Sequence, residues 1–213
     1  MSSQTSQPGW VQSATGEVSY PPAPWDMVGS LWLTLFRLRE PVDELRPAGV
    51  YGAAFVSYEE GSPLTYSELL VARPISTDAY GRRVSITDIW VDSPESVAGG
   101  RELWAIPKGL ARFERRDGSA SVEVEGRTAA SLEAWTGGRV LPGWQSFTLT
   151  TAQRLEGRTV LATNAARAHA RRATIGWDFP ADGPLAYMAD GRALFSVELD
   201  QMGISFGLSC RRS

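Results

Sequence analysis

The chain has 213 residues, of which 43% are hydrophobic and 21% charged, a balance typical of a globular protein with a substantial core. A formal net charge of −3 gives no general attraction to nucleic acid or to an anionic membrane, so we expect neither as a partner. One Cys and one His exclude an internal disulfide and leave too few ligands for a His/Cys zinc site, so we expect no metal.

Residues 1–24 are rich in Ser, Gln and Pro and are expected to pack loosely. They lack the basic and apolar regions of a signal peptide, and no apolar run in the chain approaches the roughly 20 residues needed to span a bilayer. Together with the single Cys, these features predict a cytoplasmic protein. Residues 25–213 contain no evident linker and are expected to form one domain.

The first half of this domain alternates apolar runs with turn residues. Ser93 and Pro94 suit the N-cap and the first position of a helix, which we expect to run to about Trp104. Residues 41–46 have the composition of one helical turn, ended by Pro47. Before the helix, strands are predicted over residues 31–38, 50–58, 65–72 and 82–92.

The second half consists of short apolar runs separated by turn residues, and a helical turn is expected at residues 185–189. Turns every roughly 8–12 residues favour a single antiparallel sandwich or barrel, so the pattern predicts a mainly antiparallel β fold. The predicted strands cover residues 110–115, 120–125, 129–135, 143–151, 158–164, a run ending at 177, 192–199 and 203–210.

Lys108 is the only lysine in the chain, and the other 20 basic residues are arginine. Arginine cannot be deprotonated in a protein, whereas a buried lysine shifts its pKa readily and becomes a nucleophilic amine. Lys108 lies in the apolar segment Trp-Ala-Ile-Pro-Lys-Gly-Leu-Ala, and is therefore a candidate for Schiff-base chemistry. The same pattern is compatible with an ordinary surface lysine.

The segment GGRELWAIPKGLARF, together with Tyr66-Ser67-Glu68 upstream, resembles the acetoacetate decarboxylase superfamily. Members of that superfamily carry Tyr-x-Glu, then Gly-Arg-Glu, then Pro-Lys-x-Leu about forty residues beyond the first Glu, and this chain has the same order and spacing from Tyr66 to Phe113. The resemblance implies a closed, cone-like β-barrel with a few short helices, no cofactor, and assembly into a homo-oligomer.

The resemblance also implies roles for particular residues. Lys108 would form an imine with a small-molecule carbonyl substrate, and Glu68 would transfer protons. Tyr66, Arg101 and Trp104 become candidates for contacts with the substrate. Each of these three also has a structural alternative: Tyr66 at the edge of the core, Arg101 in a pair with its neighbour Glu102, and Trp104 in core packing.

Two departures from the family pattern bear on the reaction. In the decarboxylase, the residue after the Schiff-base lysine is a second lysine, but here it is Gly109. Without that neighbouring cation, activation of Lys108 would have to come from burial by neighbours such as Trp104 and Ile106, with Arg101 as a second candidate contribution. A shift to neutrality corresponds to about three pKa units, or about 4 kcal/mol. The decarboxylase also has an arginine near its N-terminal strand, where this chain has Val28-Gly29-Ser30.

Two functions therefore remain open from the sequence. The first is a cofactor-independent lyase that acts on a small keto acid or a related carbonyl compound, by decarboxylation or by aldol and dehydration chemistry. The second is a small-molecule-binding member of the same barrel family that carries out no catalysis. The identity of the substrate and the bond that is broken stay open in both cases.

Overall fold

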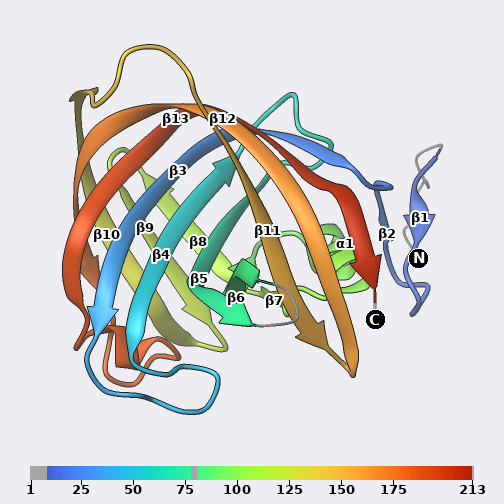
Figure 1. The fold of residues 1–213 in the computed structure, drawn as a ribbon, viewed down its shortest axis with the longest axis horizontal. Coiled ribbons are helices and arrows are strands. Elements are labelled where there is room, and N and C mark those ends of the chain that lie inside the picture. Colours follow the sequence, from blue (N-terminus) through green and yellow to red (C-terminus); the bar gives the residue numbers. More distant parts are fainter. Residues whose placement is uncertain (1–8, 78–80, 213) are drawn as a thin grey trace.

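The main feature of the molecule is an antiparallel sheet that closes on itself, seen in a computed structural model that describes residues 9–77 and 81–212 (Figure 1). The ring runs in the order β11-β6-β5-β4-β3-β13-β12, and β12 pairs back to β11. A parallel pairing between Thr151 and Val84 joins β11 to β6. The ring strands are β3 (Trp25–Leu38), β4 (Gly49–Tyr58), β5 (Tyr66–Thr77), β6 (Gly81–Val91), β11 (Gln145–Leu155), β12 (Arg158–Asp178) and β13 (Arg192–Arg212).

The remaining elements extend or cover this ring. On the far side of β12 the sheet continues through β10, β9 and β8, while β7 pairs in parallel with the end of β6. Among the described residues the helical elements are few and short, so the predicted class, a mainly antiparallel closed barrel with a few short helices, is confirmed. The elements are β1 (Val11–Gln12), β2 (Ser19–Tyr20), α1 (Pro94–Trp104), β7 (Gly109–Leu110), β8 (Arg112–Arg116), β9 (Ser119–Val124), β10 (Arg127–Arg139) and the 3-10 helix η1 (Ala186–Met188).

The two last long strands were predicted as pairs of shorter ones, and that division is wrong. β12 and β13 are continuous over 21 residues each. The sequence predicted a turn between the runs 192–199 and 203–210. At this place the structure has an irregularity in the β13–β3 pairing between Leu199 and Met202, where Gln201 has a φ of 51°. A bulge of this kind bends a strand without ending it, and a turn cannot be told from it by composition alone.

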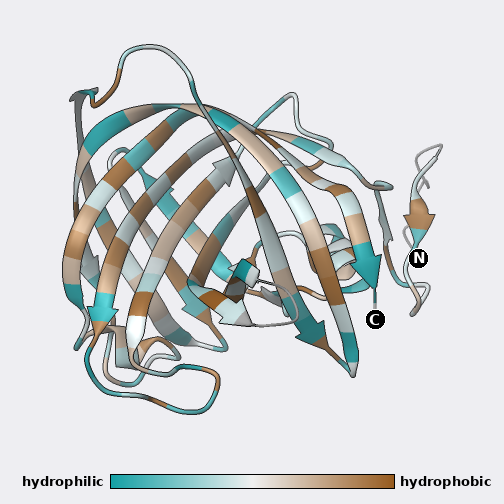
Figure 2. Ribbon diagram, viewed as in Figure 1, coloured by the Kyte–Doolittle hydropathy of each residue, from teal (hydrophilic) through white to brown (hydrophobic). Residues whose placement is uncertain are grey.

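Side chains alternate across the sheet, so each strand serves two hydrophobic clusters, and Figure 2 shows the resulting alternation of hydropathy along the strands. On β4, Tyr51 and Phe55 face one cluster, which includes residues of β9 and β10. Val56 and Tyr58 face the other, which includes Trp104 of α1 and residues of β12 and β13. The barrel wall is therefore covered on both faces at this strand.

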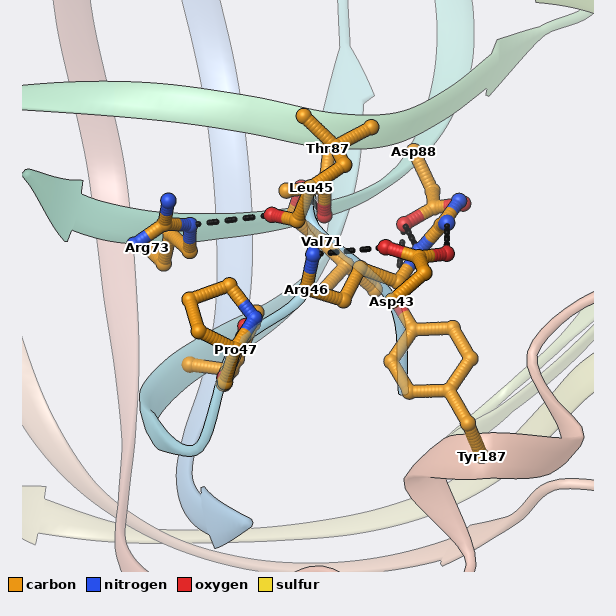
Figure 3. A network of polar contacts seen from close by, with 10 residues as sticks. Asp43, Leu45, Arg46, Pro47, Val71, Arg73, Thr87, Asp88 and Tyr187 are labelled. Atoms are coloured by element: carbon orange, nitrogen blue, oxygen red, sulfur yellow. Dashed lines mark hydrogen bonds and ion pairs between the residues drawn. The ribbon is translucent and has the colours of Figure 1, made fainter. Parts of the chain in front are cut away.

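The helical turn predicted at residues 41–46 is absent. Instead, the segment is tied down by Arg46, which donates to Asp88 Oδ1 at 2.5 Å and to Asp43 Oδ2 at 2.6 Å (Figure 3). Tyr187 of η1 also donates to Asp88, at 2.7 Å. The hydrogen bonds with Asp88 raise the pKa of the Arg46 guanidinium further above its usual range. This network, centred on the buried carboxylate of Asp88, connects the β3–β4 loop, β6 and η1, and it holds the segment in place without a helix.

The N-terminal segment was expected to pack loosely, and its first eight residues lie outside the described part of the chain. The expectation does not hold for Tyr20, which is 2% exposed and donates a hydrogen bond to Glu102 Oε2 at 2.7 Å. Glu102 also accepts from the backbone of Ala14 at 2.8 Å, so the segment is attached to α1. Within residues 9–77 and 81–212, no helix has the length and apolar character needed to cross a membrane.

Candidate active site

Helix α1 shapes the surroundings of Lys108. Ser93 caps the helix by accepting from the backbone N–H of Ser96 at 3.1 Å, and Pro94 occupies the first turn, as the sequence predicts. The helix ends at Ala105, which adopts a left-handed φ of 55°, and Pro107 prevents it from continuing. This abrupt end turns the chain back, so that Lys108 lies against the helix from which it has just emerged.

Gly100 provides the space for the lysine side chain. A Cβ atom at this position would lie 2.8 Å from Lys108 Cδ and 3.0 Å from Cε, closer than carbon atoms normally approach. Gly100 lies one helical turn after Ser96, so both residues face the lysine. The Gly-Gly pair that weakens the helix in sequence terms therefore has a packing role at this site.

Three hydrogen bonds hold the Lys108 amine. Nζ donates to Glu68 Oε2 at 2.8 Å, to Ser96 Oγ at 2.9 Å and to the Tyr66 hydroxyl at 3.2 Å. Lys108 and Glu68 are each 4% exposed, and Tyr66 is 5% exposed. The alternative of an ordinary surface lysine is therefore excluded. The structure brings together Lys108, Glu68 and Tyr66, which were singled out from the sequence, around one buried ion pair.

The electrostatics of the pair differ from what the sequence suggested. Burial lowers the pKa of Lys108, but the charge and hydrogen bond of Glu68, with a smaller contribution from Tyr66, outweigh it and raise the pKa above its ordinary value. The expectation that burial would bring the amine near neutrality is wrong for this resting geometry, because the carboxylate of Glu68 lies beside the amine. The amine is held out of water as an ammonium group.

The two tyrosines around the pair keep their protons at neutral pH. Burial, followed by the charge of Glu68, raises the pKa of Tyr58 well above its usual range, and its hydroxyl lies 3.5 Å from Glu68 Oε1. Burial also raises the pKa of Tyr66 to about 12, although the nearby charge of Lys108 opposes the shift. Both hydroxyls can therefore act as hydrogen-bond donors at neutral pH.

Arg101 and Trp104 lie in different surroundings. Arg101 is exposed on α1 and lines, together with Lys108, a pocket of about 390 Å³ at the edge of β6. Trp104 is 2% exposed and packs edge-on against Trp25, with ring centroids 4.8 Å apart. It does not line the pocket, and its place in the core agrees with the structural alternative rather than with a substrate contact.

Ser96 and Tyr58 belong to the site and were missed in the sequence. Ser96 is three residues after the helix cap, and only the return of the chain at Pro107 brings the amine to its hydroxyl. Tyr58 is opposite Tyr66 in the β4–β5 pairing, so its position depends on strand register. A register of this kind follows from long-range pairing, which one sequence does not define.

A closed antiparallel barrel with a short helix against its lysine–glutamate pair defines the acetoacetate decarboxylase type of fold. The family model described as acetoacetate decarboxylase (ADC) matches residues 12–167, and the chain therefore belongs to this family. The family resemblance stated from the sequence motifs is thus confirmed, and membership supports an enzymatic function. Comparison with curated proteins gives no significant match.

Solved structures with the same fold share little sequence with the chain. An acetoacetate decarboxylase structure has a TM-score of 0.65 at 14% identity, covering 94% of both chains. The enduracididine biosynthesis enzyme MppR, complexed with pyruvate, has a TM-score of 0.62 at 15% identity, again over 94% of both chains. An acetoacetate decarboxylase-like enzyme from Sphingomonas wittichii RW1 has a TM-score of 0.60 at 16% identity, covering 94% of this chain and 97% of that one.

Proposed function

We propose that the protein is a cofactor-independent lyase in which Lys108 forms an imine with a small 2-keto acid. The observation that carries the proposal is the Lys108–Glu68 pair, with Nζ and Oε2 2.8 Å apart and both side chains buried. A carboxylate at this distance can take the proton that keeps the amine from attacking a carbonyl carbon. The family of the chain supports the same chemistry.

In the first step, the ammonium group of Lys108 gives a proton to Glu68, and the neutral amine adds to the substrate carbonyl carbon. Tyr66 keeps its proton, since its pKa is raised to about 12, and its hydroxyl can donate to the oxygen of the resulting carbinolamine. One proton passes from the newly bonded nitrogen to that oxygen, Glu68 returns a second proton to it, and the oxygen leaves as water to produce a protonated imine. The imine accepts the electron pair of the bond that breaks next.

We place the carboxylate of the substrate near Arg101, the arginine that lines the same pocket as Lys108. An arginine at position 29 would be impossible in this fold, because a Cβ atom there would overlap the backbone oxygen of Ser57. MppR has been solved with pyruvate and with the condensation product of pyruvate and imidazole 4-carboxaldehyde. These complexes support a pyruvate-like substrate and aldol-type condensation as one reaction for this chain.

Imine formation can be read from intact mass combined with peptide mapping, because Lys108 is the only lysine and an adduct on the α-amino group would map to a different peptide. Incubation with pyruvate and cyanoborohydride should add one reduced pyruvate unit, and peptide mapping should locate it at Lys108. Lys108→Arg is the matched variant, since arginine keeps a positive charge beside Glu68 but cannot be deprotonated to a nucleophile. It should give no adduct at this position. Absence of an adduct with pyruvate, acetoacetate and other small keto acids would refute the imine.

The role of Glu68 can be tested by the pH dependence of trapping, that is, of the rate at which cyanoborohydride converts the imine into a stable adduct. Transfer of the proton inside the pair leaves its net charge unchanged, so the initial trapping rate of the parent protein should be nearly flat between about pH 6 and 9. In Glu68→Gln the main cause of the raised Lys108 pKa is gone and burial lowers the pKa, so the rate should climb with pH until the amine is neutral. Reduction of a preformed small-molecule imine at each pH corrects for the reagent. A tenfold rise per pH unit in the parent protein would contradict proton transfer to Glu68.

The raised pKa of Lys108 also favours a second function, in which the ammonium group binds an anionic ligand without reacting. In that case calorimetry should detect saturable binding of a keto acid, Lys108→Arg should retain that binding, and no reducible adduct should form. Turnover of the bound keto acid would rule out this alternative.

A further inference from the structure

A second cavity lies on the opposite face of the barrel wall. It encloses about 570 Å³ between the strands β8, β9 and β10 and the wall formed by β4, β3 and β13. Trp32, Phe55 and Glu198 line it from neighbouring strands, since Glu198 pairs with Trp32 and Trp32 with Phe55. Phe55 in turn pairs with Leu69, the residue next to Glu68. Because successive side chains of a strand point to opposite faces, this cavity is separate from the site of Lys108.

Glu198 is a buried acceptor without a hydrogen-bond donor. The residue is 8% exposed, and its Oε2 atom has no hydrogen-bond partner among the residues that the structure describes. Arg171 Nε lies 3.7 Å away, which is near enough for charge attraction but too far for a hydrogen bond. A buried acceptor of this kind is rare in folded proteins because it loses its water without replacement. A ligand that donates to Oε2 would restore the bond.

Arg115 supplies a positive charge to the same cavity. Its guanidinium carbon lies 5.6 Å from the centre of the Trp32 ring, and Nη1 donates to the hydroxyl of Ser57. Ser57 occupies one of the five N–H donors of the group, so a planar fork of donors remains for an anion. The indole and the hydroxyl hold the guanidinium in place, which lowers the entropy lost when a ligand binds.

We propose that this cavity binds a small amino acid with an apolar side chain. Its ammonium group would donate to Glu198, its carboxylate would accept from Arg115, and its apolar body would lie against the adjacent rings of Trp32 and Phe55, whose centroids are 6.1 Å apart. The three features occur in one cavity and match the three parts of such a ligand: an acceptor without a hydrogen-bond donor, a held cation and a pair of adjacent aromatic rings. This site is independent of the imine chemistry proposed for Lys108.

The test uses the full chain and three probes with one phenyl body. They are L-phenylalanine, 3-phenylpropanoate, which lacks the amino group, and phenethylamine, which lacks the carboxylate. Titration calorimetry should give saturable binding of L-phenylalanine and at least about tenfold weaker binding of each analogue, because each one loses a hydrogen bond to a charged group. This ranking is measured on the unaltered protein and does not depend on a variant that folds.

Variants then assign each end of the ligand. Glu198→Gln should remove the advantage of phenylalanine over 3-phenylpropanoate, and Arg115→Gln should remove its advantage over phenethylamine. Arg101→Gln, which alters the other pocket, should bind phenylalanine as the parent does. No binding of phenylalanine, equal affinity for the three probes, or loss of binding in Arg101→Gln would overturn the proposal. None of these results depends on whether Lys108 forms an imine.

Discussion

Replacing Lys108 with methionine should lower the free energy of unfolding by about 3–5 kcal/mol, because the change leaves Glu68 buried without its cation. The carboxylate is 4% exposed, and Lys108 Nζ at 2.8 Å is its closest charged partner in the described structure. Methionine has nearly the same length as lysine and can occupy the space over Gly100, so little of the loss would come from an empty cavity. Denaturant unfolding at neutral pH measures the change.

A double-mutant cycle separates the ion pair from its parts. Glu68→Leu alone should also destabilise, because it leaves the ammonium group with two neutral partners, Ser96 and Tyr66. Lys108→Met combined with Glu68→Leu should lose less than the sum of the single changes by at least about 2 kcal/mol, since the double variant buries no charge. Additive losses would mean that the two side chains do not form a pair in solution.

The expected recovery bears on why the pair exists. Apolar residues of similar volume often replace a buried ion pair with no loss of stability, so stability alone gives little reason to keep one. In this chain the pair also includes the sole lysine, and a glycine gives its side chain room. A buried ion pair that adds nothing to stability is typical of sites in which charged groups are retained for chemistry.

The sequence predicted those parts of the fold and site that depend on neighbouring residues. Ser93 and Pro94 defined the start of α1, and the apolar run at residues 50–58 placed β4 within one residue of its observed bounds. Lys108 and Glu68 were found because the motif spacing reflects their contact across the barrel. Long-range features had no local signal: the Thr151–Val84 pairing that closes the ring and the bulge at Gln201 follow from the assembled sheet.

The direction of the Lys108 pKa shift could not be predicted for a related reason. Burial and a nearby carboxylate act in opposite directions, and the balance between them depends on the distance between two side chains forty positions apart. The second cavity was also invisible in the sequence. Glu198 and Arg115 belong to strands that are far apart along the chain, and only the assembled sheet brings them to the two sides of one cavity.

Replacing Gly29 with alanine should destabilise the protein by about 3 kcal/mol. A Cβ atom at this position would overlap the backbone oxygen of Ser57 and lie 3.1 Å from Tyr58 Cα, and these are backbone atoms of the paired strand β4. A flexible side chain could rotate away, but the backbone of β4 can yield only if β3 and β4 separate. Such a separation would strain the hydrogen bonds of the ring next to Tyr58, a neighbour of Glu68.

Gly49→Ala is the matched control, because Gly49 begins β4, the strand that faces Gly29 in the sheet, and the nearest atom to an added Cβ is 4.0 Å away. At such an open position alanine should be neutral or stabilise by up to about 1 kcal/mol through the lower entropy of the unfolded chain. Thermal unfolding of the two variants side by side makes the comparison. If Gly29→Ala were as stable as Gly49→Ala, β3 and β4 would have to be further apart than the structure has them.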